Sequence, residues 1–247
     1  MVERGDLDGA GWSGNVTSEN ARQERDFDLL ICDCDGVIVD SEIVADRVLA
    51  QVIGARFPGR GAETLLENSF GQQTETLLQR IVQHVGEPLP PDFPEYLRRL
   101  IDETLEREVL PIHGIRDALE CVDRPIAVVS NSPVGRVKIA IRRAGLEHLI
   151  GDRIFSADMV AHPKPAPDVY LLAAATLSVE PQRCLVVEDS GPGVTAALAA
   201  GMSVIGFTGA SHIPSGHGAT LMSLGANHVL TSMEFLAETI AKLRRNG

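Results

Sequence analysis

Aromatic residues and positive charge are both scarce in this chain of 247 residues. Phe, Trp and Tyr together account for 4% of it, so the sequence shows no set of aromatic side chains on which nucleic-acid bases could stack. Lys and Arg number 22 against 34 Asp and Glu, which gives a net charge of −12. Proteins that bind nucleic acids usually carry a basic face. We therefore expect no nucleic-acid partner.

Long hydrophobic runs and metal-type cysteine spacings are also absent from the sequence. No apolar stretch approaches the ~18–20 residues of a membrane span, and residues 1–6 lack the apolar core of a signal peptide. We expect a cytoplasmic protein, a monomer or weak homodimer, with no membrane partner. Three of the four cysteines lie in apolar runs, which predicts buried, reduced thiols. The cysteines are Cys32, Cys34, Cys121 and Cys184.

Strand-like and helix-like segments alternate from residue 27 onward. The runs 126–129 and 184–187 are apolar throughout, as expected of strands that are covered on both faces. Alternating β and α elements predict an α/β fold, a Rossmann-like parallel sheet with right-handed crossovers. The expected strands are 27–33, 125–131, 153–156, 183–188, 203–207 and 227–230. The expected helices are 134–145, 167–178, 190–200 and 233–245.

One interval breaks this alternation and shows only helical periodicity. We expect helices at 43–56, 61–68, 73–84 and 92–108. The pattern predicts a small all-helical domain, residues 43–110, inserted between the first two strands. The remaining core would comprise residues 26–42 and 111–247. Residues 1–25 are polar and aperiodic, and we expect a disordered leader there.

Two aspartates stand where the first predicted strand ends. The apolar run 29–31 is followed by Asp33, Asp35 and Gly36, and Gly36 lets the chain turn. Open α/β sheets bind their ligands at the carboxyl ends of the strands. Two carboxylates this close repel each other, and a divalent cation such as Mg²⁺ would remove that cost. The alternative is a polar strand end with an Asx turn.

A hydroxyl and an amide follow the second predicted strand. Ser130 and Asn131 precede a helix, and a helix N-terminus can bind an anion through its backbone N–H groups. The alternative is that Ser132, directly before Pro133, caps this helix. Taken alone, the segment favours capping.

Two further segments carry charged candidates. Lys164 stands between prolines, which restrict the backbone around it, and such a lysine is either fixed towards a ligand or solvated at the surface. Glu188 and Asp189 end another apolar strand, and they are either metal ligands or partners of the following helix dipole. Together these groups supply a nucleophile, a general acid, an anion site, a cation and metal ligands. That set suits phosphoryl transfer through an aspartyl phosphate.

These motifs, in this order, resemble those of the haloacid dehalogenase superfamily, in the branch with a helical cap inserted after the first strand. The resemblance covers about residues 27–245. It implies that Asp33 is the nucleophile and Asp35 the general acid and base. It also implies that Ser130 and Asn131 bind the phosphate, and that Lys164 balances its charge.

The same resemblance implies a magnesium cofactor, with Mn²⁺ as a substitute. The expected ligands are the Asp33 and Asp189 carboxylates and the Asp35 backbone carbonyl, with Glu188 beside the metal. The sequence departs from the family pattern directly before Lys164, where His162-Pro163 replaces the more usual glycine. That replacement is expected to alter the lysine loop locally.

Asp35 points to phosphate esters, because the dehalogenases and phosphonatases of the superfamily lack this second aspartate. The expected function is a magnesium-dependent phosphatase acting on a small sugar, polyol or sugar-acid phosphate. β-Phosphoglucomutase keeps both aspartates and is the alternative, but its cap-hinge histidine is replaced by Ala45 and its cap arginine falls in 71–75, which has none. A catalytically inactive binding or regulatory member is a further alternative.

The cap segment before the helix at 73–84 is the candidate for substrate specificity. Its neutral amide and hydroxyl groups suit a polyhydroxy alcohol, although they could also only cap that helix. The run 206–212 resembles the sugar- and polyol-phosphate phosphatases, while His113 and His212 are expected to be structural or loop residues. The specificity candidates are Gly71, Gln72, Gln73 and Thr74.

Overall fold

The structure, a computed structural model, describes residues 27–66 and 74–245. The predicted leader at 1–25 lies outside the described residues. The same holds for Gly71, Gln72 and Gln73, so that Thr74 is the one specificity candidate whose position is described.

A parallel sheet of six strands forms the centre of the described residues, in the order β3-β2-β1-β4-β5-β6. All six predicted strands are confirmed, each within two residues at either end. Strands β1 to β4 are buried along their whole length, as the sequence indicated, whereas the edge strand β6 is only partly buried. The strands are β1 (Leu29–Cys32), β2 (Ile126–Ser130), β3 (Ile154–Ser156), β4 (Cys184–Glu188), β5 (Ser203–Phe207) and β6 (His228–Leu230).

The sheet order contains a topological switch point beside β1. The chain runs from β1 outward to β2 and β3, and then crosses back to β4 on the other side of β1. The connections on the two sides of β1 therefore leave in opposite directions, and ligands of open α/β sheets bind at the carboxyl ends of strands beside such a point. The predicted site residues lie at this edge.

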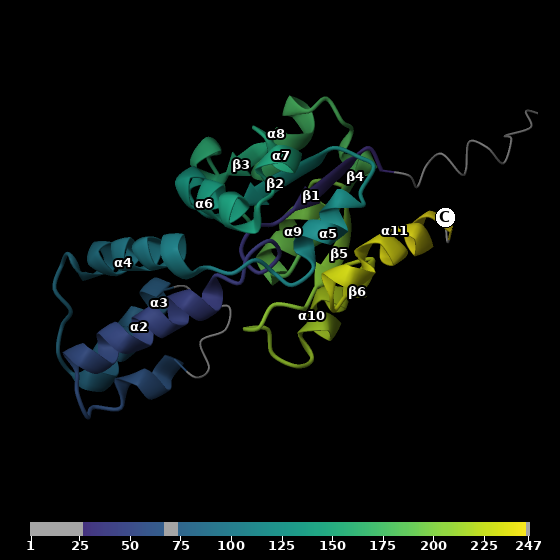
Figure 1. The fold of residues 1–247 in the computed structure, drawn as a ribbon. Helices are drawn as coiled ribbons and strands as arrows, with labels where there is room; N and C mark the ends of the chain where they lie inside the picture. The colour runs from purple at the N-terminus through teal and green to yellow at the C-terminus, as the bar shows by residue number, and fades with distance from the viewer. Residues whose placement is uncertain (1–26, 67–73, 246–247) are drawn as a thin grey trace, which may run out of the picture.

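Alternate side chains of each strand enter two apolar layers, one on each face of the sheet. In β1, Leu30 and Cys32 pack into one layer, whereas Leu29 and Ile31 pack into the other. Helices on both faces cover these layers (Figure 1). The first layer contains residues of α5 (Ile115–Glu120), α6 (Val134–Ala144), α7 (Glu147–Ile150) and α11 (Leu236–Arg245); the second contains residues of α8 (Asp168–Thr176), α9 (Gly191–Ala199) and α10 (His217–Leu224).

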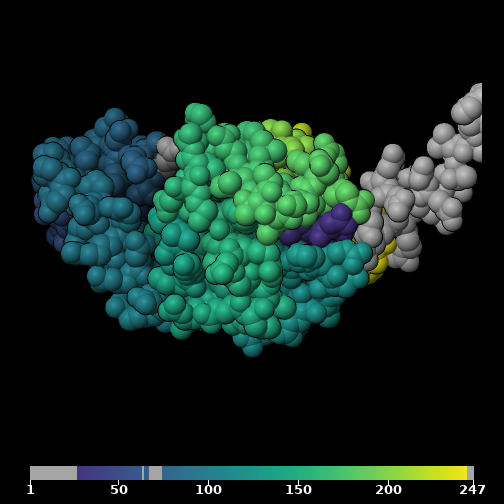
Figure 2. Space-filling view, turned by 90° about the horizontal axis from the view of Figure 1, so that it is seen from above, coloured from purple at the N-terminus to yellow at the C-terminus, as the bar shows by residue number. Residues whose placement is uncertain are grey.

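The helices between β1 and α5 form a lobe beside the sheet (Figure 1), which we call the cap. Seen from above, its blue residues abut the teal and green of the core (Figure 2). The predicted inserted helices are confirmed, although the one expected at 61–68 is a 3₁₀ helix in its described part. The domain boundaries at 42/43 and 110/111 stay a prediction. The elements are α2 (Glu42–Arg56), η1 (Ala62–Leu66), α3 (Thr74–Val85) and α4 (Phe93–Glu108).

The two connections between cap and core run side by side. The Asp40 N–H donates to the Leu110 carbonyl, and the Ile112 N–H donates to the Ile38 carbonyl, each at 2.9 Å. The cap also contacts the core directly, since Arg136 at the start of α6 donates to Asp102 of α4, with Nε at 2.9 Å from Oδ1. The cap is thus tied to the core at its linkers and along α4.

Three short helices were not predicted: α5, α7 and α10. They span four to eight residues, which is too short for a 3.6-residue period to repeat clearly. The helix predicted at 233–245 begins as a 3₁₀ turn, η4 (Met233–Phe235), and two other 3₁₀ turns are η2 (Ala157–Met159) and η3 (Pro181–Arg183). Among the described helices, none has the length and hydropathy that crossing a membrane requires.

Candidate active site

The polar residues predicted from separate parts of the chain meet at one edge of the sheet. Asp33 directly follows β1, Ser130 ends β2, Glu188 ends β4, and Asp189 comes next. The Asp33 N–H donates to the Val187 carbonyl at 2.9 Å, which extends the β1–β4 pairing to Asp33. All four side chains are buried. Parallel strand ends share an edge, and this brings the groups together.

Lys164 lies at the centre of this group with 3% of its side chain exposed. Its Nζ lies 2.5 Å from Asp33 Oδ1, 2.8 Å from Glu188 Oε1 and 3.0 Å from the Val129 carbonyl oxygen. The ammonium also stands 4.8 Å from the ring centre of the buried Tyr170. The solvated alternative for this lysine is therefore wrong, and its side chain is fixed against the predicted nucleophile.

Negative charge exceeds positive charge in this buried group. Burial raises the pKa of Asp33 well above its usual value, and Glu188 and Asp189 add to the rise, while Lys164 opposes it. Burial and the neighbouring Glu188 likewise raise the pKa of Asp189, again against Lys164. Burial would lower the pKa of Lys164, but the Asp33 and Glu188 carboxylates outweigh this and raise it. Lys164 therefore stays charged. Its single positive charge does not balance the negative charge of the carboxylates around it.

Asp35 is held by hydroxyl groups from two elements. Ser41, next to the first residue of α2, donates to Asp35 Oδ1 at 2.6 Å. Ser132 donates to Oδ2 at 2.7 Å, and Ser130 donates to the same oxygen at 3.3 Å. Its carboxyl group is thus oriented between the cap linker and the end of β2, two residues beyond Asp33.

The capping interpretation of Ser132 is wrong. Helix α6 begins after Pro133 with no side-chain cap, and the Val134 N–H donates instead to Asp158 Oδ2 at 3.0 Å. Ser132 turns to Asp35 because the β1–β2 pairing brings the two strand ends together. That contact spans 97 residues, which local sequence does not reveal.

Asn131 connects the end of β2 to the lysine loop. Its Oδ1 accepts from the Lys164 N–H at 3.0 Å, and its Nδ2 donates to the Lys164 carbonyl at 3.1 Å. Because the amide side chain makes both of these bonds, it fixes the loop that carries the lysine. Contact with a phosphate would then fall to the backbone N–H of Asn131.

Glu188 has protein donors on both of its oxygens. Oε1 accepts from Lys164, and Oε2 accepts from the Ser190 N–H at 2.8 Å and from Ser190 Oγ at 3.0 Å. The first turn of α9 packs on this carboxylate, since a Cβ on Gly193 would lie 1.6 Å from Oε1. The geometry therefore gives Glu188 the task of holding Lys164, and its predicted place beside a metal stays a prediction.

The donor set suits a hard divalent cation. In residues 27–66 and 74–245, no group of three or more His, Cys, Asp or Glu side chains is arranged to hold a metal. The ligand set that the resemblance implies does not need one, because it uses two carboxylates and a backbone carbonyl. Gly36, at φ +80°, makes room for this set: a Cβ there would lie 2.0 Å from Asp189 Oδ2. The crowded carboxylates therefore fit Mg²⁺.

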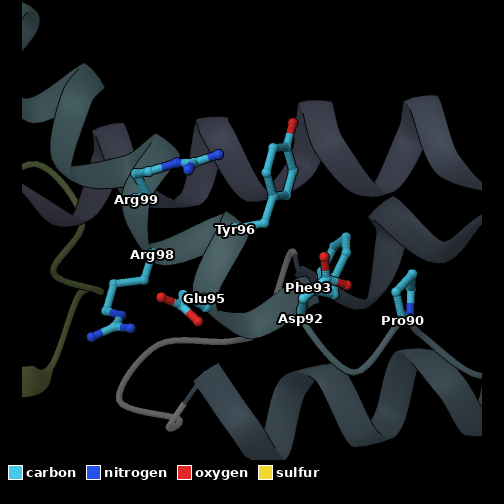
Figure 3. Close-up of a pocket in the computed structure, with 7 residues that line it drawn as sticks. All are labelled: Pro90, Asp92, Phe93, Glu95, Tyr96, Arg98 and Arg99. Atoms are coloured by element: carbon cyan, nitrogen blue, oxygen red, sulfur yellow. The ribbon is translucent and has the colours of Figure 1, made fainter.

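The predicted specificity segment is described only in part. Thr74 is exposed at the first position of α3, and the other three specificity candidates fall outside the described residues. The hollow in Figure 3 is formed by residues 90–99 around the start of α4, among them Tyr96, Arg98 and Arg99. It belongs to the cap surface and contains none of the strand-end acids.

Three residues near the site were not predicted to act there. Ser41 contacts Asp35, and Tyr170 lies under Lys164 with its hydroxyl 3.5 Å from Glu188 Oε1. His212, expected to be a structural or loop residue, lies in a turn, and its Nε2 is 3.5 Å from Asp189 Oδ2. His113, in contrast, is almost fully exposed and faces Glu234. The one sequence feature that pointed to His212 was its place in the run 206–212, which follows β5.

Comparison with known proteins identifies the family. The family model of haloacid dehalogenase-like hydrolases matches residues 27–201. The 6-phosphogluconate phosphatase of Escherichia coli is 27% identical over 192 residues, 73% of this chain and 82% of that protein. The fructose-1-phosphate phosphatase of the same species is 30% identical over 181 residues, 71% of this chain and 94% of that protein.

A solved structure agrees with these sequence matches. A haloacid dehalogenase-like protein from Agrobacterium tumefaciens superposes with a TM-score of 0.78 at 38% identity, over 88% of this chain and 99% of that one. The chain belongs to the haloacid dehalogenase-like hydrolase family, and the predicted resemblance and fold class are confirmed. It is an enzyme, and the names of its curated relatives support its predicted class, the phosphoric monoester hydrolases.

Proposed function

We propose that the protein is a magnesium-dependent phosphatase that hydrolyses a small sugar, polyol or sugar-acid phosphate in the cytoplasm. One observation carries this proposal: the buried Asp33 is ion-paired to Lys164, and Asp35 stands two residues further on, oriented by hydroxyl groups. A nucleophile and an acid in that relation suit the cleavage of a phosphate ester. The names of the two Escherichia coli relatives support a sugar or sugar-acid substrate.

In the first step, an oxygen of Asp33 attacks phosphorus. A bond between that oxygen and phosphorus forms while the bond from phosphorus to the alcohol oxygen breaks, and Asp35 gives a proton to the departing alcohol. In the second step, Asp35 takes a proton from water, and the water oxygen attacks phosphorus. Inorganic phosphate leaves and the Asp33 carboxylate is restored.

The neighbouring residues keep these two acids in place and receive the phosphoryl group. Lys164 holds one Asp33 oxygen, which leaves the other for attack, and its charge offsets that of the phosphoryl oxygens. Ser130 is a hydroxyl donor at the same strand edge, and Asn131 fixes the Lys164 loop. These roles rest on position, charge and burial.

Magnesium would be held by the Asp33 and Asp189 carboxylates and the Asp35 carbonyl, with Glu188 beside it and Mn²⁺ as a substitute. When bound, the ion offsets the charge on the transferring phosphoryl group. Burial and excess negative charge at Asp33 and Asp189 support this assignment.

The mutase alternative is less well supported. Ala45, which replaces the hinge histidine of the mutase, is partly buried and packs against the apolar core. A methyl group there offers no hydrogen bond to a second phosphate. Assaying a panel of sugar phosphates for released inorganic phosphate and for isomerised product distinguishes hydrolysis from transfer. Titration calorimetry with the same panel identifies an inactive binding protein, which would show binding without turnover.

The nucleophile assignment is tested by Asp33→Asn. We expect this variant to lose turnover of p-nitrophenyl phosphate in Mg²⁺, because an amide oxygen cannot form the covalent intermediate. The matched control is Asp117→Asn, an exposed carboxylate on α5. Activity above a few per cent of wild type in Asp33→Asn would show that another group attacks phosphorus.

A further inference from the structure

Two histidines that follow β5 contact Asp189 at opposite ends: His212 in the connection to α10, and His217 at the first position of α10. His212 Nε2 lies 3.5 Å from Asp189 Oδ2, at the side chain. His217 Nε2 lies 2.7 Å from the Asp189 backbone carbonyl oxygen, where it must donate, because a carbonyl oxygen only accepts. The segment after β5 thus contacts the side chain of Asp189 through His212 and its main chain through His217.

The second nitrogen of His212 faces the cap linker. His212 Nδ1 lies 3.5 Å from the buried Oδ1 of Asp40, and only 10% of the imidazole side chain is exposed. Asp40 is fixed in turn, because its Oδ2 accepts from the Ser211 N–H at 3.1 Å and its own N–H donates to the Leu110 carbonyl. The imidazole therefore stands between a fixed linker residue and Asp189.

Gly36 closes the other side of the Asp189 carboxylate. A Cβ at position 36 would lie 2.0 Å from Asp189 Oδ2 and 3.2 Å from His212 Cε1, so all three groups are in close contact. The carboxylate is confined between a backbone without a side chain and a nearly buried ring. Removing the ring would open space into which the carboxylate could rotate.

We propose that His212 and His217 are positioning residues that fix Asp189 in the orientation needed to bind the divalent cation. The inference rests on the proposed function, in which Asp189 is a metal ligand. Groups that orient a metal ligand typically change metal affinity 10–100-fold when they are removed. Neither histidine is assigned a contact with substrate, so the effect belongs to metal binding.

The test compares wild type, His212→Ala and His212→Asn, with His148→Ala as the control. His148 is an exposed histidine on α7 that faces Glu120, a similar pairing away from the strand ends. Two measurements are made on each protein: the Mg²⁺ concentration that gives half of the maximal thermal stabilisation without substrate, and the KM for p-nitrophenyl phosphate at saturating Mg²⁺. If His212→Ala does not fold without metal, the same two measurements are made on His217→Ala, which removes the contact with the Asp189 backbone carbonyl.

We expect the Mg²⁺ midpoint to rise tenfold or more in His212→Ala, with KM changed less than twofold. His212→Asn should fall between Ala and wild type, because its amide can donate to one carboxylate. A midpoint within twofold of wild type would overturn the proposal, and so would a midpoint and a KM that rise by the same factor, which indicates general loosening. If Mg²⁺ does not stabilise the wild-type protein, the proposed magnesium site itself is wrong. That outcome differs from a failure of the histidine proposal, in which wild type and variants are stabilised alike.

Discussion

Lys164 is a cation placed where burial alone would disfavour its charge. Three oxygen acceptors and the face of Tyr170 surround its ammonium group, and two of these acceptors are carboxylates. A buried ion pair is costly to form, but removing one partner leaves the other charge unpaired and is more costly still. The lysine is therefore needed both for the fold around the site and for the charge at it.

Replacing Lys164 by Met tests both roles at once. We expect turnover to fall by on the order of 10²-fold or more, since the phosphoryl group loses its positive neighbour. We also expect the free energy of unfolding to fall by about 3–5 kcal/mol, because Asp33 and Glu188 stay buried without their partner. Activity assays and urea titrations measure the two effects. Lys138→Met, at an exposed position on α6, should change neither, and an unchanged unfolding midpoint in Lys164→Met would contradict the argument.

At the scale of residues, we also expect activity to depend on a divalent cation. Asp33, Asp35 and Asp189 supply oxygen donors only, which suit Mg²⁺ or Mn²⁺ better than Zn²⁺. Treatment with EDTA should abolish hydrolysis of p-nitrophenyl phosphate, and added Mg²⁺ or Mn²⁺ should restore it. An enzyme that stays fully active in EDTA after dialysis against chelator would refute the assignment of the metal.

At the scale of elements, the first turn of α9 packs on Glu188, which holds Lys164. Gly193→Ala would place a Cβ 1.6 Å from Glu188 Oε1, so the carboxylate must move away from Lys164. We expect at least about tenfold lower kcat and about 1–3 kcal/mol lower unfolding free energy, as for other overpacked sites. Kinetics and chemical denaturation measure these changes.

The matched control for that substitution is Gly54→Ala in α2. A Cβ at position 54 meets no atom within 4 Å, so this change should raise the unfolding free energy by about 0.5–1 kcal/mol through helix propensity. If the unfolding free energy falls in Gly193→Ala and rises in Gly54→Ala, the loss in Gly193→Ala is due to the contact with Glu188. Equal effects would mean that propensity alone decides both.

Which elements could be predicted depended on how far their signals extend along the chain. The central strands are long apolar runs, and such runs can be predicted from the sequence. Because parallel strands share a carboxyl edge, the sequence also predicted that Asp33, Ser130 and Asp189 would lie close together. Helix α7 spans only Glu147–Ile150, less than two helical turns, and left no periodic signal. The contact of Ser132 with Asp35 depends on the pairing of two strands, and local residues favoured capping instead.

The whole molecule divides its work between two lobes. The core carries every described group that would touch the phosphoryl group, and the linker to the cap adds Ser41, which donates to Asp35. We therefore expect the core to act on any small phosphate ester and the cap segment 71–74 to select the leaving alcohol. Closure of such a lobe also excludes water, which strengthens the electrostatic contacts inside.

This division predicts a split in kinetics when Gln72, Gln73 and Thr74 are changed together to Ala. The kcat/KM for the preferred sugar phosphate should fall by tenfold or more, about 1.4 kcal/mol, because hydroxyl contacts are lost. The value for p-nitrophenyl phosphate, which has no sugar hydroxyls, should change much less. Alanines at the exposed Gln51 and Gln83 of the cap are the control. Equal losses for both substrates would assign the segment to cap stability or closure.

The paired linkers have a consequence for how this enzyme can acquire new substrates. Because residues 38–40 and 110–112 are hydrogen-bonded to each other, the two ends of the cap stay at a fixed spacing whatever lies between them. The entropic cost of closing the chain segment between the two linkers rises only slowly with the length of that segment. The intervening segment can therefore be lengthened, shortened or exchanged with that of a relative while the strand ends stay where they are. If the cap selects the leaving alcohol as proposed, we expect that exchanging this one continuous segment changes the substrate and leaves the phosphoryl chemistry intact.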